Sequence, residues 1–439
     1  MKTLFSIFLG ICIHCCLSIK IYALPINEIY KPSFEYLCEN SPAFKAILAN
    51  SDKAETLAHM SCAETKLFIK TIGKISINQM DFSDEREENA LLAILSLADN
   101  LEVIKIFNST LSALNFPENL KKLKKVFVEN TPVYSIYFAN PNSVEQLVLK
   151  KTDLRFSFFI SKEFFNLKKL EISGNPYLVL VSFDDNLRNL EHINLSENSI
   201  IKFSFPKKLK SLKKFDISSN KLLTYSFPDI REEHGRLSSL ESLNFSRNYI
   251  LGEFKVPETL TSLKNLDLSF TNISGLVIPK EVKNLEVVKA NHSSIEYIKL
   301  NPYLINLFSL ELSNNHKLKA IDIPSGLLNL QNIDISYSPV ASFHIPPGGI
   351  PHLKILNLIN TEVKEIQVTR ENESCITRIT SNHEIKNFHM SLLSDNNIAN
   401  DNSCLISVED DTHIIETNYI ENSVEGGYRV ELFYKQKTD

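Results

Sequence analysis

Leucine-like residues recur along most of the chain in the pattern LxxLxLxxNxL, in which Ser or Thr often replaces Asn. Neighbouring copies start 21 to 23 residues apart, except for one spacing of 28 residues after Leu212. A unit of this size cannot bury its own apolar side chains, so the pattern predicts a solenoid in which each turn packs on the next. The copies begin at Leu101, Leu123, Val144, Leu167, Leu190, Leu212, Leu240, Leu263, Leu285, Leu307, Leu330 and Leu353.

A second apolar run follows the ninth position of most copies. In the copy that begins at Leu190, this run is Phe203 and Phe205, followed by Pro206. Alternation with a period of two residues predicts a short strand, and proline ends it because proline has no N–H for the ladder. Most turns are therefore expected to hold a strand on each side, with few convex helices.

The repeated pattern resembles that of the leucine-rich repeat superfamily, in its exported or extracellular type. Residues 318–324 (LKAIDIP) resemble the repeats of surface antigens, and residues 272–279 (NISGLVIP) are more similar to plant extracellular repeats. The resemblance implies an α/β-type solenoid that is mostly β, with a curved parallel sheet. It also implies a binding function.

The repeat divides the chain into a solenoid and two caps. Residues 72–370 are expected to form about 13 repeats. A helical N-terminal cap is predicted for residues 24–71 and a β-rich C-terminal cap for residues 371–439. Within the N-terminal part, Ser41-Pro42 predicts a helix start, and Asp52 with Glu55 is close to a capping box. Ser83 is expected to cap a further helix.

The first 23 residues have the pattern of a secretory signal peptide. Lys2 precedes an apolar run that ends at Ile19, and Ala23 closes a cleavage-like sequence. An uncleaved membrane anchor is the alternative, although the run is short for a bilayer span. The product is expected to be secreted or held at the cell surface, without a stable membrane span in the mature chain.

Cysteine usage agrees with export. Three cysteines lie within the predicted signal, and the other four flank the repeats: Cys38, Cys62, Cys375 and Cys404. An even number in an exported chain predicts the disulfides Cys38–Cys62 and Cys375–Cys404. Free buried thiols are the alternative. A net charge of −5 and an apolar fraction of 43% argue against a disordered chain and against general nucleic-acid binding.

The second position alternates in sign over nine consecutive copies. Strands of neighbouring turns lie ~4.8 Å apart, so each charge would lie between two opposite ones. The pattern favours a structural ladder of ion pairs, and a charged ligand stripe is the alternative. The residues are Glu102, Lys124, Glu145, Lys168, Glu191, Lys213, Glu241, Lys264 and Glu286.

The third, fifth and seventh positions should point from the inner strands onto the concave face of the sheet. This face is apolar towards the N-terminal end of the repeats and polar, mildly acidic in the centre. It is the predicted ligand-binding face, and a basic or amphipathic protein partner would suit it. The alternative is that the N-terminal cap covers the apolar part. The candidate residues are Phe107, Phe127, Val148, Glu171, Asn194, Asp216, Asn244 and Asp267.

Motifs of catalysis, phosphate binding and metal binding are absent from the sequence, so no enzyme activity, cofactor or metal is expected. His192 and His292 lie near the inner strands in non-adjacent copies and are interpreted as incidental. Asn194 and Asn244 are in glycosylation sequons, and glycans there would block the concave face. The sequence thus predicts an exported protein that binds another protein. A structural or adhesive component of a cell surface or wall is the alternative.

Overall fold

The computed structural model describes residues 32–228, 237–345, 350 and 352–363, together with the backbone of the strands that lie between residues 365 and 436. The predicted signal peptide, Cys375 and Cys404 lie outside the described residues. The chain divides into two compact units. The first combines Met1–Leu123 with Thr131–Pro141, and the second combines Lys124–Asn130 with Asn142–Asp439.

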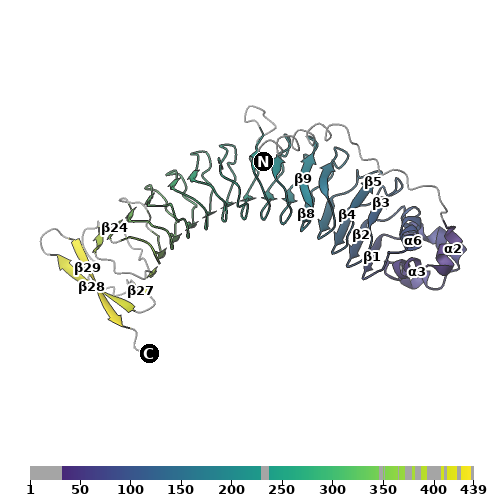
Figure 1. Ribbon diagram of the computed structural model, residues 1–439, viewed down its shortest axis with the longest axis horizontal. Coiled ribbons are helices and arrows are strands. Elements are labelled where there is room, and N and C mark those ends of the chain that lie inside the picture. Colours follow the sequence, from purple (N-terminus) through teal and green to yellow (C-terminus); the bar gives the residue numbers. More distant parts are fainter. Residues whose placement is uncertain are drawn as a thin grey trace, which may run out of the picture. The chain divides into compact units, whose positions relative to one another are not determined.

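The first unit begins with short helices that gather at the purple end of the ribbon (Figure 1). Ser41 caps α3 and Pro42 occupies its first turn, as predicted. The other two predicted caps are wrong. Asp52 does not cap α4 but accepts hydrogen bonds from the backbone of Gly73 and Lys74. Asp84, and not Ser83, caps α6. The helices are α2 (Phe34–Asn40), α3 (Pro42–Ala49), α4 (Ala54–Leu57), α5 (Cys62–Phe68), the 3-10 helix η1 (Ile69–Thr71) and α6 (Glu85–Leu95).

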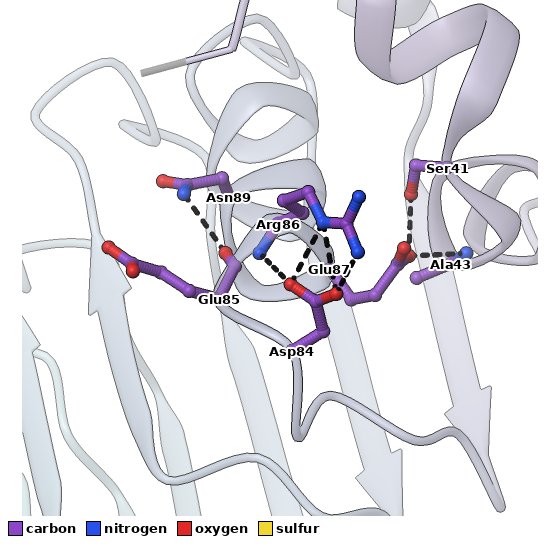
Figure 2. Close-up of polar contacts among 7 residues, drawn as sticks. All are labelled: Ser41, Ala43, Asp84, Glu85, Arg86, Glu87 and Asn89. Carbon is purple, nitrogen blue, oxygen red and sulfur yellow. Dashed lines mark hydrogen bonds and ion pairs between the residues drawn. The ribbon is translucent and has the colours of Figure 1, made fainter. Parts of the chain in front are cut away.

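Two contacts join these helices. Glu87 of α6 accepts hydrogen bonds from the Ser41 hydroxyl at 2.6 Å and from the Ala43 N–H at 2.8 Å, so its carboxylate lies at the positive N-terminal end of α3 (Figure 2). A disulfide joins Cys38 of α2 to Cys62 of α5, with 5.9 Å between the Cα atoms. The rest of this unit holds two parallel strand pairs, β1 (Lys74–Asn78) with β2 (Val103–Phe107), and β3 (Ala113–Phe116) with β5 (Ser135–Phe138).

The second unit is built on a parallel sheet. Its strands within the copies begin two residues after the first residue of the copy, and its last two parallel strands lie beyond the final copy. These inner strands are β4 (Lys125–Glu129), β6 (Gln146–Lys150), β8 (Lys169–Ser173), β10 (His192–Asn194), β12 (Lys214–Asp216), β14 (Ser242–Asn244), β15 (Asn265–Asp267), β17 (Val287–Lys289), β19 (Ser309–Glu311), β21 (Asn332–Asp334), β23 (Ile355–Asn357), β25 (Arg378–Thr380) and β27 (Ser407–Glu409). Each pairs in register with the next. The long strands β28 (His413–Asn422) and β29 (Gly427–Gln436) follow in antiparallel pairing (Figure 1).

The second apolar run of each copy forms outer strands, as predicted. They are β7 (Phe156–Ile160) with β9 (Leu178–Phe183), β11 (Lys202–Ser204) with β13 (Thr224–Ser226), and the series β16 (Gly275–Val277), β18 (Tyr297–Lys299), β20 (Ala320–Asp322), β22 (Ser342–Ile345), β24 (Glu365–Arg370) and β26 (Asn387–Leu392). The predicted fold, a parallel solenoid with strands on both sides and few helices, is confirmed.

Leucines of the inner strands and aromatic residues of the outer strands meet in the core. Phe203, Phe215 and Phe245 are at most 1% exposed. Phe205 packs on Phe215, with ring centroids 4.5 Å apart, and on Phe227 at 4.8 Å. These rings come from consecutive turns, so the core is continuous along this part of the unit.

Buried asparagines at the ninth position join one turn to the next. Asn220 accepts a hydrogen bond from the N–H of Ile200 in the preceding turn and donates to the carbonyl oxygens of Leu195 and Ile217. Asn198 and Asn248 repeat this arrangement. The predicted structural role of this column is therefore confirmed, because each amide satisfies turn groups that would otherwise be buried without partners.

The charged second positions form separate ion pairs. Lys168 lies 2.9 Å from Glu145, Lys213 lies 2.9 Å from Glu191, and Lys264 and Glu241 are 3.4 Å apart. The sequence predicted that each lysine lies between two glutamates, and the backbone pairing of neighbouring copies places Lys168 and Lys213 in this way. Within this arrangement, each of the three lysines forms its ion pair with the glutamate of the preceding copy. Lys213 holds the pKa of Glu191 below its usual range, mainly through this hydrogen bond.

Reversing one charge of this series tests its energetic role. We expect Lys168→Glu to lower the free energy of unfolding by about 0.5–1 kcal/mol, because it replaces an attractive contact with Glu145 by a repulsive one. The double change Glu145→Lys with Lys168→Glu should recover part of the loss. Urea titrations at low salt measure both. Equal stability of the wild type and both variants would contradict an energetic role, and the differences should shrink in 1 M salt.

Candidate functional site

The exposed face of the inner strands carries side chains in aligned rows, and it is called the strand face here. The turn after each strand holds this alignment. The eighth residue of each copy from Asn130 to Asn360 has left-handed backbone, with φ between 49° and 70°, and only Gly174 among them is a glycine. Because the turns share one geometry, equivalent side chains of successive copies lie in register.

A side-chain hydrogen bond fixes the conformation of the residue at the fifth position of several copies. Its Asn or Asp side chain accepts a hydrogen bond from the N–H two residues later, which forms an Asx turn. The accepting and donating residues are Asn194 and Ser196 (2.9 Å), Asp216 and Ser218 (2.8 Å), Asn244 and Ser246 (3.0 Å), Asp267 and Ser269 (2.9 Å), and Asp334 and Ser336 (3.0 Å). Asn194 and Asn244 thus form sequons because Asn, two residues before Ser, is the turn pattern of the repeat itself.

A depression of about 480 Å³ lies in the strand face of the second unit, over β8, β10, β12 and β14. Leu170, Ile193 and Phe215, which are buried, are among the residues that line it. Third and fifth positions line it in two rows. The residues are Lys169, Glu171, His192, Asn194, Lys214, Asp216, Ser242 and Asn244.

The row of third positions is basic. His192 of β10 lies in register between Lys169 of β8 and Lys214 of β12. Lys169 is neutralised within its own strand by Glu171, at 3.1 Å between Nζ and Oε2. Lys214 is exposed and makes no side-chain hydrogen bond or ion pair among the described residues.

The row of fifth positions holds acids and amides that already have partners. One carboxylate oxygen of Asp216 accepts from the Ser218 N–H at 2.8 Å, and the other accepts from Nδ2 of Asn244 at 3.0 Å. Glu171 is paired with Lys169. Both carboxylates of the depression therefore have partners within the fold, although Asp216 keeps its negative charge because its partners are neutral. Lys214 has no side-chain partner among the described residues.

His192 is only partly exposed, and burial lowers the pKa of its imidazole. The positive charge of Lys214 lowers this pKa further, whereas Glu191 raises it. Because the ordinary value is already about 6.5, His192 is expected to be mostly neutral at pH 7. Its charge would respond to any anion that approaches Lys214.

Among the described residues, no group of three or more His, Cys, Asp and Glu is arranged to hold a metal ion. No helix in the described part of the chain has the length and apolar character needed to cross a membrane.

No protein-family model matches the chain. The chain is 25% identical over 275 residues to adenylate cyclase of Schizosaccharomyces pombe, a match that covers 58% of this chain and 14% of that protein. It is 24% identical over 255 residues to Protein PAC2 of Saccharomyces cerevisiae, a match that covers 54% of this chain and 41% of that protein. The chain spans less than half the length of either relative, so neither assigns it an activity.

Solved structures with a similar arrangement include an internalin from Listeria monocytogenes, with a TM-score of 0.42 and 14% identity over 72% of this chain and 95% of that one. Another is a leucine-rich repeat protein of Leptospira interrogans, with a TM-score of 0.41 and 20% identity over 67% of this chain and 86% of that one. The repeat geometry decides the fold: parallel strands begin at the same position of every copy, and buried asparagines join consecutive turns. The chain has the leucine-rich repeat fold.

Only some of the site residues that the sequence predicted lie together in the structure. Glu171, Asn194, Asp216 and Asn244 line the depression, and Asp267 lies on the next strand of the same face. The side-chain oxygens of Asn194, Asp216, Asn244 and Asp267 also hold the Asx turns, a role that the sequence did not predict.

The apolar candidates differ from expectation. Val148 is only 7% exposed, so the prediction of an outward apolar surface is wrong there. It lies in register between the larger Phe127 and Glu171, which accounts for its burial. Phe127 of β4 is half-buried, as is Phe107 of β2 in the first unit.

The sequence did not lead us to predict the basic row of third positions. His192 was interpreted as incidental because it was considered only beside His292, which lies in a non-adjacent copy. The signal was present in the sequence, since Lys169, His192 and Lys214 occupy the third position of three consecutive copies.

Proposed function

We propose that this leucine-rich repeat protein is exported and binds another protein through its strand face, with the depression over β8 to β14 at the centre of the contact. The observation that carries the proposal is the depression itself, which is lined by polar side chains from four consecutive strands. Polar side chains held in register over several strands offer hydrogen-bond donors and acceptors to a protein partner.

Rigidity supports binding at this face. The left-handed turns and the Asx hydrogen bonds fix the side chains before any partner arrives. A preorganised surface loses little conformational entropy on association, so a larger part of the contact energy appears as affinity. A solenoid also offers a long open surface of the kind that repeat proteins use for large partners.

Export is supported by the signal-like residues 1–23 and by the disulfide between Cys38 and Cys62. The sequence favoured a basic or amphipathic partner, and the structure adds that the acids Glu171 and Asp216 have an ion-pair partner or hydrogen-bond partners within the fold.

The test compares charge changes on the two sides of the solenoid. Residues 24–439 are used to capture the partner, and affinity is measured for Lys214→Glu and Asp216→Lys in the strand face. Lys202→Glu on the outer strand β11 is the matched control, because Lys202 is also exposed. We expect both strand-face variants to bind about tenfold or more weakly and the control to bind normally. Lys214→Glu, which removes no side-chain hydrogen bond among the described residues, should do so at unchanged melting temperature.

Equal affinity of all variants would contradict binding through this face. Recovery of the chain only in a detergent-resistant envelope fraction, without a saturable partner, would instead favour the structural or adhesive function.

A further inference from the structure

The second unit exposes large apolar side chains along the edge at which its inner strands end. In four consecutive turns, two neighbouring apolar or aromatic residues follow the buried asparagine of the ninth position, and only one of the two is buried. The buried members are at most 1% exposed and are Leu178, Ile200, Leu222 and Leu251. The exposed members form a row that is called the apolar edge here: Tyr177 (60% exposed), Ile201 (36%), Leu223 (54%) and Ile250 (54%).

Backbone hydrogen bonds place the apolar edge across adjacent turns. The N–H of Leu223 donates to the carbonyl oxygen of Ile201 at 2.9 Å, and the N–H of Phe156 donates to the carbonyl oxygen of Tyr177 at 2.9 Å. Phe156 is 78% exposed, so it extends the apolar edge by one turn. The row therefore crosses five consecutive copies of the repeat, from the one that begins at Val144 to the one that begins at Leu240.

The fold requires only one apolar residue of each pair. The next two copies keep the buried residue of this turn, as Ile273 and Ile295, but their exposed neighbours are Ser274 and Glu296. Polar residues are therefore compatible with the turn, and folding does not account for the apolar edge. Because apolar surface in water is unfavourable, a contiguous row of this kind usually marks a site of interaction.

An excess of positive charge coincides with the apolar edge. The eighth to thirteenth residues of the same five copies contain five Lys or Arg and two Asp or Glu, hence a formal charge of +3. The same positions of the next two copies contain no Lys or Arg and one Glu, hence −1. Lys151, Lys221 and Arg247 are among the cations, and all three are exposed. The cations and the exposed apolar side chains thus occur together in the same turns.

We propose that the apolar edge docks on the surface of a lipid membrane that contains anionic lipids. Exposed apolar side chains beside Lys and Arg are typical of protein segments that lie in such a surface, and Phe156 and Tyr177 suit the boundary between water and hydrocarbon. A fluid bilayer accommodates projecting side chains of different shapes, whereas a protein partner would need a matching pocket for each. The inference is independent of the proposed function, because it concerns a different surface from the strand face.

The experiment measures sedimentation of residues 24–439 with vesicles of phosphatidylcholine, alone or with roughly 30% phosphatidylserine. We expect tighter binding to the anionic vesicles. Leu223→Ser with Ile250→Ser should weaken this binding by about tenfold, because two apolar side chains are lost from the contact. The matched control is Ile305→Ser with Leu328→Ser. These side chains are 50% and 48% exposed but precede the inner strands, so the control should bind normally.

A second pair of substitutions tests the charge. Lys151→Gln with Lys221→Gln should bind the anionic vesicles about tenfold more weakly and the neutral vesicles as the wild type does, because only anionic lipids attract the lost cations. The replaced side chains are all exposed, so circular dichroism and melting temperature should match the wild type in every variant.

Three outcomes would overturn the proposal. The first is that the wild type binds neither kind of vesicle, and the second is that both pairs of serine substitutions weaken binding equally. The third is self-association or partner binding that Leu223→Ser with Ile250→Ser abolishes while vesicle binding stays unchanged, because the apolar edge would then contact protein. Vesicle binding is measured without the partner of the strand face, so failure of either proposal leaves the other intact.

Discussion

Replacing Asn220 by alanine is expected to lower the free energy of unfolding by about 3 kcal/mol. Its amide accepts from the N–H of Ile200 at 2.9 Å and donates to the carbonyl oxygens of Leu195, Ile217 and Ser218 at 2.9 to 3.1 Å. The side chain is 5% exposed, so water cannot replace these bonds. A buried group that loses its partner costs about 1–3 kcal/mol, and here groups of two turns lose theirs at once.

A graded series separates hydrogen bonding from packing. The ninth position holds Thr or Ser in other copies, and the Thr271 hydroxyl there donates only to Leu268 and contacts the Ser293 hydroxyl. Asn220→Thr should therefore retain about half of the stability that Asn220→Ala loses. Urea unfolding of residues 24–439, followed by circular dichroism, measures the series. A loss below ~1 kcal/mol in Asn220→Ala would show that the column is not a principal link between turns.

Phe215→Ala is expected to have the largest effect, a loss of about 3–5 kcal/mol. The ring is 1% exposed and contacts three others, with centroids 4.5 Å from Phe205, 4.9 Å from Phe203 and 6.0 Å from Phe245. These rings belong to three consecutive turns, so the cavity would weaken both interfaces of one turn. In a solenoid such interfaces carry most of the stability.

Two variants control for this change. Phe215→Leu introduces the residue type found at the equivalent position of half of the copies and should cost roughly 1–1.5 kcal/mol. Phe308→Ala removes a ring that is 42% exposed and should change stability by about 0.5 kcal/mol or less. Hydrogen exchange should show loosened protection in the turns around Phe215. A loss as small as that of Phe308→Ala would mean that the aromatic cluster is not a cohesive core.

The sequence predicted the core positions and strands that follow from burial and from the period of the repeat. Leu190, Ile193, Leu195 and Ile200 follow the pattern, and each is at most 2% exposed. The outer run of Phe203 was likewise recognised as a strand. Such positions are predictable because an apolar side chain at a fixed spacing has only one favourable environment in a stacked solenoid.

It was harder to predict which exposed polar side chains bond each other. Asp216 looked like a ligand for a basic partner, yet both its oxygens are used by the fold. Lys214 looked ordinary, yet it remains without a side-chain partner within the described residues. The difference depends on side-chain directions and on distances of a few ångströms between copies more than 20 residues apart, which no local pattern records.

The alternation of Lys168, Lys213 and Lys264 with glutamates restricts how the molecule can change its length. Removing one copy would place the row of Glu145 beside that of Glu191, so that two like charges would meet where an ion pair had been. Removing two copies would restore opposite neighbours. The alternating charges thus favour gain or loss of repeats in even numbers. If the protein became longer in evolution, we would expect it to do so by duplication of pairs of repeats.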